Sequence, residues 1–263
     1  MQIAGFLFIA CAASAIGAIS GIGGGIIIKP VLDALSGQGI AEINLLSGST
    51  VLAMSLVSLL RSRGGGVALE PKRGTALAGG AALGGAAGKL IFSAALRFFP
   101  RPALIGIIQS LILILLTLMV LGYLKKKKTM RPRNIRHIPF CVFIGLLLGM
   151  VSAFLGIGGG PVNIMVISYF FSMDSKTTAL HSLYTIFLSQ AASFLLMLAE
   201  NSMPPVHPVF IIAMVTGGIS GGLIGSRIVK VISNDQADRL FSGVLGLVIL
   251  LSAYNAVRLA VLG

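Results

Sequence analysis

The string Gly-Ile-Gly-Gly-Gly occurs twice in this chain, and both copies interrupt a long apolar segment. The copies occupy residues 21–25 and 156–160, so the second copy starts about half a chain length after the first. Glycine runs break helices, free backbone N–H groups and let a ligand approach the main chain closely. A short helix that restarts after each run, at Ile26 and at Pro161, would point its free N–H groups and positive dipole end at the break. The duplicated break therefore predicts an anion site built from backbone.

Polar side chains near the breaks add neutral hydrogen-bonding groups and one cation. Hydroxyls and amides beside two helix N-termini suit a small oxyanion, whereas a bound cation prefers carboxylate ligands. All seven acidic residues fall at or near the ends of predicted segments. The predicted substrate-binding residues are Gly21, Gly23, Gly24, Gly25, Lys29, Ser49, Thr50, Gly156, Gly158, Gly159, Gly160, Asn163, His181 and Ser182.

Each of these side chains also has a structural interpretation. Serine and threonine in membrane helices commonly bond their own backbone one turn back. Lys29 either neutralises an anion or extends to the membrane interface, and extension to the interface is the favoured interpretation for Lys89 and Arg227. His181 either accepts a coupled proton or packs with a satisfied hydrogen bond.

Composition indicates which solvent surrounds these sites. Hydrophobic residues make up 56% of the chain and charged residues 10%. Apolar stretches long enough to cross a bilayer as helix recur along the chain, which predicts an all-α polytopic membrane protein. The predicted segments are 3–36, 43–60, 74–96, 102–124, 138–172, 177–199, 207–231 and 238–261.

These eight segments form two sets of four, separated by a basic linker. We expect a first transmembrane repeat over 1–124, a cytoplasmic linker over 125–137 and a second repeat over 138–263, because basic loops stay on the cytoplasmic side. The first segment of each set is too long for one crossing and must be broken or re-entrant. Hairpins at these segments would move Lys176, Arg227, Lys230 and Arg239 to the side of the linker, so charge favours hairpins over eight simple crossings. Three full crossings per set would then make the repeats inverted.

The third segments of the two sets carry matching glycine ladders. Glycine at every fourth position lays a bare stripe along a helix, so that a neighbouring backbone packs closely. The two ladders are separated by nearly the same interval as the two glycine strings, and we interpret them as helix-packing positions rather than ligand sites. They comprise Gly80, Gly84 and Gly88 in the first set and Gly217, Gly221 and Gly225 in the second.

The paired glycine strings, the glycine ladders and the basic central linker resemble the sulfite exporter TauE/SafE family of bacterial membrane permeases over the whole chain. The resemblance implies transport of small sulfur-containing anions, such as sulfite or sulfoacetate, across the bacterial plasma membrane. It also implies that the glycines of both strings form a backbone cradle for the anion. Pro161 follows the second string directly, whereas the first string continues with three isoleucines before Lys29, so the half-sites are expected to be unequal.

We therefore expect a secondary transporter in the bacterial inner membrane, and a passive anion channel built on the same cradle is the alternative. No P-loop or metalloprotease motif occurs, so an enzyme is not expected, and nothing indicates a cofactor or a metal site. The expected partners are a small anionic substrate and the lipid bilayer. A coupling proton or sodium ion and the oligomeric state stay open, and nucleic acid is not an expected partner.

Overall fold

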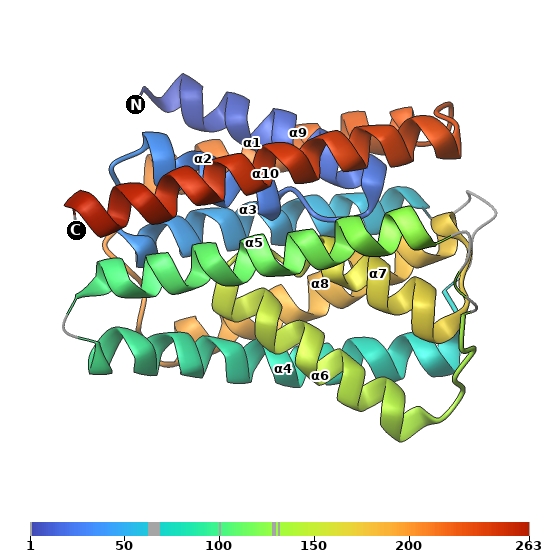
Figure 1. Cartoon of the computed structure of the whole chain (residues 1–263). Coiled ribbons are helices and arrows are strands. Elements are labelled where there is room, and N and C mark those ends of the chain that lie inside the picture. Colours follow the sequence, from blue (N-terminus) through green and yellow to red (C-terminus); the bar gives the residue numbers. More distant parts are fainter. Residues whose placement is uncertain (1, 63–68, 100, 128–129, 131, 263) are drawn as a thin grey trace.

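A computed structural model describes the chain at residues 2–62, 69–99, 101–127, 130 and 132–262 (Figure 1). Of the predicted linker, residues 128, 129 and 131 lie outside this set. Within the described residues the chain forms ten helices and no strand. The helices are α1 (Ile3–Ser20), α2 (Gly25–Leu35), α3 (Ile40–Ser62), α4 (Pro71–Phe98), α5 (Pro102–Lys126), α6 (Ile138–Leu155), α7 (Gly160–Phe171), α8 (Ser175–Ala199), α9 (Pro208–Ile228) and α10 (Asn234–Leu262).

The prediction of an all-helical membrane protein is confirmed. Eight of the described helices are long and apolar enough to cross a bilayer. The other two, α2 and α7, have 11 and 12 residues and follow the two glycine strings. They begin one residue before the predicted restarts, at Gly25 and Gly160, and Pro161 occupies the first turn of α7, where its missing N–H breaks no helical bond.

Each long first segment is thus two helices that fold back on each other. Figure 1 shows both termini at one end of the bundle, and the end of α5 and the start of α6 at the other; we call these the terminal end and the linker end. α2 returns to the terminal end, where Arg258 donates hydrogen bonds of 2.7 and 2.9 Å to the carbonyls of Asp33 and Ala34. α7 returns to the linker end, where the carbonyl of Tyr169 accepts a 2.9 Å bond from the backbone N–H of Arg133.

The glycine ladders lie where helices of one half pack closely against helices of the other. A Cβ on Gly80, Gly84 or Gly88 of α4 would collide with backbone of α6, and one on Gly217, Gly221 or Gly225 of α9 would collide with backbone of α1. The carbonyls that approach them belong to Val142, Leu146 and Met150 in α6 and to Leu7, Cys11 and Ala15 in α1. These two triplets are separated by the same interval as Gly21 and Gly156, so contacts of the same kind recur at matching positions of the two halves.

Candidate functional site

The two glycine strings meet in the middle of the bundle. Gly25 lies against the carbonyl of Ile157, and a Cβ on Gly160 would stand 3.5 Å from the side chain of Ile26. A Cβ on Gly23 would lie 3.9 Å from the carbonyl oxygen of Gly158. All eight glycines predicted to form the cradle are buried. The structure therefore brings together two breaks that lie half a chain apart in the sequence.

The backbone at the breaks explains the choice of glycine. φ is 81° at Gly23 and 89° at Gly159, a region that side chains of L-residues rarely adopt. Gly21 and Gly156 end α1 and α6 in the left-handed conformation, with φ of 70° and 66°. The chain at each break is thus non-helical and buried, and such backbone is tolerated in a membrane protein where protein covers it.

The side chains between the breaks are apolar. Ile22, Ile26 and Ile157 are at most 1% exposed; the side chains of Ile22 and Ile26 lie near Gly160, and the carbonyl of Ile157 lies against Gly25. The side chain of Val51 in α3 lies against Gly158, where a Cβ would stand 2.5 Å from it. The side chain of Ile186 in α8 would stand 3.3 Å from a Cβ on Gly23. The polar groups that could hold an anion therefore lie around this contact rather than within it.

Lys29 reaches the second break rather than the first. Its ammonium donates a 2.6 Å hydrogen bond to Oδ1 of Asn44, and a Cβ on Gly156 would collide with that amide. Lys29 is 3% exposed, and Asp33 lies 4.0 Å from its Nζ. The side chain is therefore held inside the protein. Asn44 is not among the site residues predicted from the sequence. The only sequence signal for it is that a polar residue stands within an apolar helix.

Asn163 also lies at the second break. A Cβ on Gly159 would lie 2.6 Å from the amide nitrogen of Asn163, whose side chain is buried. Its Oδ1 has no hydrogen-bond partner within the described residues. A buried amide oxygen without a partner is unfavourable, so this group is available to a ligand or a water molecule.

The predicted hydroxyls divide into two groups. Ser49 and Thr50 donate to carbonyls of their own helix, at 2.8 Å to Leu45 and 2.7 Å to Leu46, as the structural interpretation expects. Ser182 is fully buried, and its Oγ has no partner in the described part of the chain. The same holds for Ser47, which occupies the equivalent position of the first half and which the predicted site omits.

Ser47 and Ser182 lie on the helix faces that contact the breaks. On α8, Ala179 contacts Gly21 and Ile186 contacts Gly23, and Ser182 lies between them on the same face. On α3, Asn44 contacts Gly156 and Val51 contacts Gly158, and Ser47 lies between them. The internal repeat would have revealed Ser47 as the counterpart of Ser182.

His181 points toward the start of α4. Its Nε2 accepts a 3.0 Å hydrogen bond from the backbone N–H of Glu70, and its Nδ1 lies 2.9 Å from the carbonyl of Thr177. Since a neutral imidazole donates from only one nitrogen, this pairing assigns the proton to Nδ1. Both ring nitrogens are satisfied, which favours the packing interpretation of this residue.

Two cavities at opposite ends of α3 and α8 are lined by equivalent residues of the two halves. The cavity nearer the terminal end, the Lys89 cavity, also contacts Gly156 of the second break. The cavity nearer the linker end, the Lys230 cavity, contacts Ala179, which packs on Gly21 of the first break. Equivalent lining residues are Ala41 and Lys176, Asn44 and Ala179, Gly48 and Leu183, Lys89 and Ser226, Phe92 and Val229, and Ser193 and Ser58.

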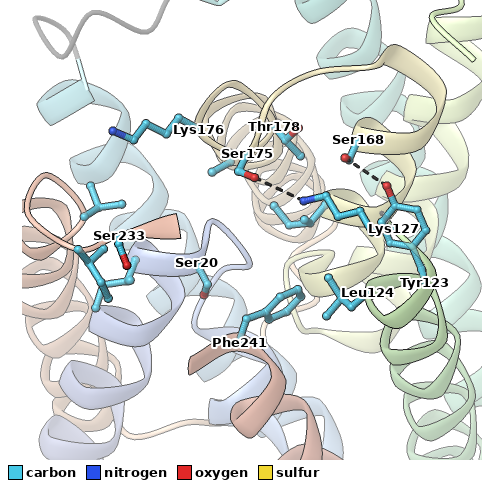
Figure 2. A pocket seen from close by; sticks show the side chains of 15 residues that line it. Ser20, Tyr123, Leu124, Lys127, Ser168, Ser175, Lys176, Thr178, Ser233 and Phe241 are labelled. Carbon is cyan, nitrogen blue, oxygen red and sulfur yellow. Dashed lines mark hydrogen bonds between the residues drawn. The ribbon is translucent and has the colours of Figure 1, made fainter. Parts of the chain in front are cut away.

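A third pocket opens beside the end of α1 at the linker end (Figure 2). Figure 2 shows the side chain of Lys127 extending to Ser175, with a hydrogen bond of 3.4 Å. Asp174 caps α8 there, and hydrogen bonds from Thr177 and from the backbone N–H of Lys176 hold the pKa of its carboxyl below the usual range. The N-terminus of α8 is thus occupied by its own carboxylate, although the pocket is basic.

Comparison with known proteins agrees with this architecture. The family model described as sulfite exporter TauE/SafE matches residues 6–252, which include both glycine strings and both ladders. No curated protein and no solved structure matches the chain. On the extent of that match, the chain belongs to the sulfite exporter TauE/SafE family.

Proposed function

We propose that the protein is a secondary transporter of a small sulfur-containing anion, either sulfite or a small organosulfonate such as sulfoacetate, and that it works by alternating access. Membership of the family implies membrane transport of sulfite-type anions. The conjunction of two broken helices near the middle of the membrane is the arrangement in which many secondary transporters bind their substrates.

The two halves act as inverted repeats in this proposal. Residues 1–124 and 138–263 are the repeats, and 125–137 is the cytoplasmic linker. The support is that α1 with α2 begins and ends at the terminal end, whereas α6 with α7 begins and ends at the linker end. Each pair then acts as a re-entrant hairpin, and the three long helices that follow it cross the membrane.

The pair of equivalent cavities carries the proposal. The Lys89 cavity and the Lys230 cavity lie at opposite ends of α3 and α8, and their lining residues are related by the repeat. Each leads to the neighbourhood of one break. An anion that enters one cavity would bind near the breaks and leave through the other when one repeat shifts against its partner.

The apolar contact between the breaks favours a carrier over the channel alternative. Ile22, Ile26 and Ile157 are buried where the two strings meet, which leaves them no exposure to a permanently open pathway. Substrate movement therefore requires that the packing of the two repeats change. The driving force would come from an ion gradient or from the membrane potential, because an inside-negative potential helps an anion leave the cell.

Uptake by proteoliposomes tests the function. Purified protein is reconstituted, and entry of radiolabelled sulfite is measured as a function of sulfite concentration, with protein-free liposomes and with acetate as a control anion. The proposal predicts saturable entry of sulfite that sulfoacetate inhibits and acetate does not. Discrete single-channel currents, or flux that rises linearly without saturation, would overturn the carrier.

A further inference from the structure

The Lys89 cavity contains the ammonium group of Lys89, which forms no ion pair with a carboxylate of the described residues. Lys89 lies within α4, and its ammonium stands 5.9 Å from the centroid of the Phe92 ring, which also lines the cavity. Within the described residues Lys89 forms no ion pair. The acid whose charge acts on it, Glu200, is exposed at the end of α8. A cation inside a membrane-spanning helix is costly unless an anion or polar groups compensate it.

Neutral donors surround this charge. Asn44 lines the same cavity, and its Nδ2 is buried without a hydrogen-bond partner in the part of the chain that the structure describes. Ser193 and Gln190 also line it, and Gln190 donates to Ser152 at 3.2 Å. None of the described residues that line the cavity is acidic. A cation with an unpaired amide N–H₂ and a hydroxyl suits an anion that has several oxygen acceptors.

Asn44 connects this cavity to the second break. Its Oδ1 accepts from Lys29, and its amide lies against Gly156, while its Nδ2 is the atom left without a partner among the described residues. An oxyanion on Nδ2 would thus sit beside the Lys29 charge as well as the Lys89 charge. The two charges would act on it from α2 and from α4, which belong to the same half.

We propose that Lys89, Asn44 and Ser193 form a binding site for one small oxyanion of the sulfite or sulfonate class, next to the second glycine break. The proposal rests on the proposed transport function and specifies where the anion binds on the terminal side. It also makes the two cavities unequal. In the Lys230 cavity the equivalents are Ser226, Ala179 and Ser58, and the Ser226 hydroxyl donates to its own backbone at 2.9 Å.

Binding to purified protein in detergent provides the test. The probe is sodium methanesulfonate, which carries the sulfonate group and does not react with thiols, and affinity is measured by isothermal titration calorimetry. Lys89→Met should weaken binding about tenfold or more, because a charge-assisted hydrogen bond is lost. Asn44→Asp should weaken it as well, since an acceptor oxygen then replaces the unpaired donor. Arg97→Gln is the matched control, because Arg97 is exposed on the same helix outside the cavity.

Folding is checked separately by the elution profile on size-exclusion chromatography. If Lys89→Met does not fold, Lys89→Gln and Ser193→Ala carry the test. Unchanged affinity in the folded cavity variants, or an equal loss in Arg97→Gln, would overturn the site.

The same variants in proteoliposomes separate this inference from the proposed function. Saturable sulfite transport that Lys89→Met leaves intact would overturn the site and leave the transporter standing. Binding of methanesulfonate that depends on Lys89, in protein that carries no sulfite across the membrane, would keep the site and overturn the transport function. Absence of both binding and transport in the unmodified protein would overturn both.

Discussion

Lys29 and Asn44 join the first broken helix to the second break, through a hydrogen bond of 2.6 Å between Nζ and Oδ1. The bond lies between α2 and α3, yet Asn44 rests on Gly156 of the other half. A positive charge of one half of the chain is thus fixed beside the backbone break of the other. This relation makes the two half-sites unequal, because the residue equivalent to Lys29 is Ile164 and the residue equivalent to Asn44 is Ala179.

Lys29→Met is expected to reduce sulfite transport by about tenfold or more, since the loss of a charged donor near the breaks removes about 1.5 kcal/mol of anion stabilisation. It should also lower the free energy of unfolding by about 1–3 kcal/mol, because Oδ1 of the partly buried Asn44 side chain loses its donor. Initial rates of uptake in proteoliposomes and thermal unfolding followed by circular dichroism measure the two effects. Lys72→Met, at an exposed position in the first turn of α4, is the control. Equal rates in Lys29→Met and Lys72→Met would contradict a role for this charge.

Leucine at the breaks should abolish anion binding. At Gly24 the new side chain would collide with the backbone of Ser14, and at Gly159 the residue would have to adopt a φ of 89° beside Asn163. We measure the temperature at which half the protein still elutes as a single species. Sulfite should raise this temperature in the unmodified protein and leave it unchanged in Gly24→Leu and Gly159→Leu. Gly243→Leu is the control, because a Cβ there has open space.

The milder variant Gly23→Ala provides the same test if the two leucine variants do not fold. Its Cβ would come no closer than 3.3 Å to a neighbouring atom, so the strain comes mainly from the φ of 81°. A full response to sulfite in Gly24→Leu, Gly159→Leu and Gly23→Ala would rule out the backbone cradle.

The buried hydroxyls of Ser47 and Ser182 should matter for transport and not for stability. Because neither Oγ has a partner in the described structure, Ser47→Ala and Ser182→Ala remove an unsatisfied group and leave stability within about 0.5 kcal/mol or raise it slightly. We expect the apparent KM for sulfite to rise several-fold in each variant. Ser55→Ala serves as the control, since its buried hydroxyl bonds its own helix and lies outside both cavities. A rise in KM that is as large in Ser55→Ala would remove these two hydroxyls from the site.

The ladder on α4 offers a stability test within one helix. A Cβ on Gly84 would collide with the carbonyl of Leu146, whereas a Cβ on Gly79 has open space. Gly84→Leu should lower the free energy of unfolding by at least about 3 kcal/mol, because α4 and α6 must separate. Gly79→Leu should change it by less than about 1 kcal/mol. Thermal unfolding followed by circular dichroism compares the two, and similar losses would show that the glycine stripe does not set the packing.

The sequence predicted the features that depend on local spacing. The breaks, the restarts at Gly25 and Gly160 within one residue, and both ladders follow from glycine, proline and apolar length alone. It did not predict that Lys29 would meet Asn44, because contacts between helices depend on how they pack. Helical periodicity alone also could not choose Ser47 over Ser49 on α3, although the interval of the glycine strings relates Ser47 to Ser182. That helix is apolar around most of its surface, so periodicity does not mark the face that contacts the breaks.

The most direct measurement of the central claim, that equivalent positions of the two halves serve opposite faces of the membrane, uses single cysteines at Ala41 and Lys176. These residues line the two cavities and are related by the repeat. Both variants are made in a Cys11→Ala, Cys141→Ala background, because these are the two native cysteines. A membrane-impermeant thiol reagent is applied to right-side-out and to inverted vesicles. We predict that Ala41→Cys reacts only in right-side-out vesicles and Lys176→Cys only in inverted ones; reaction of both from the same side would contradict the inverted repeat and the transport route built on it.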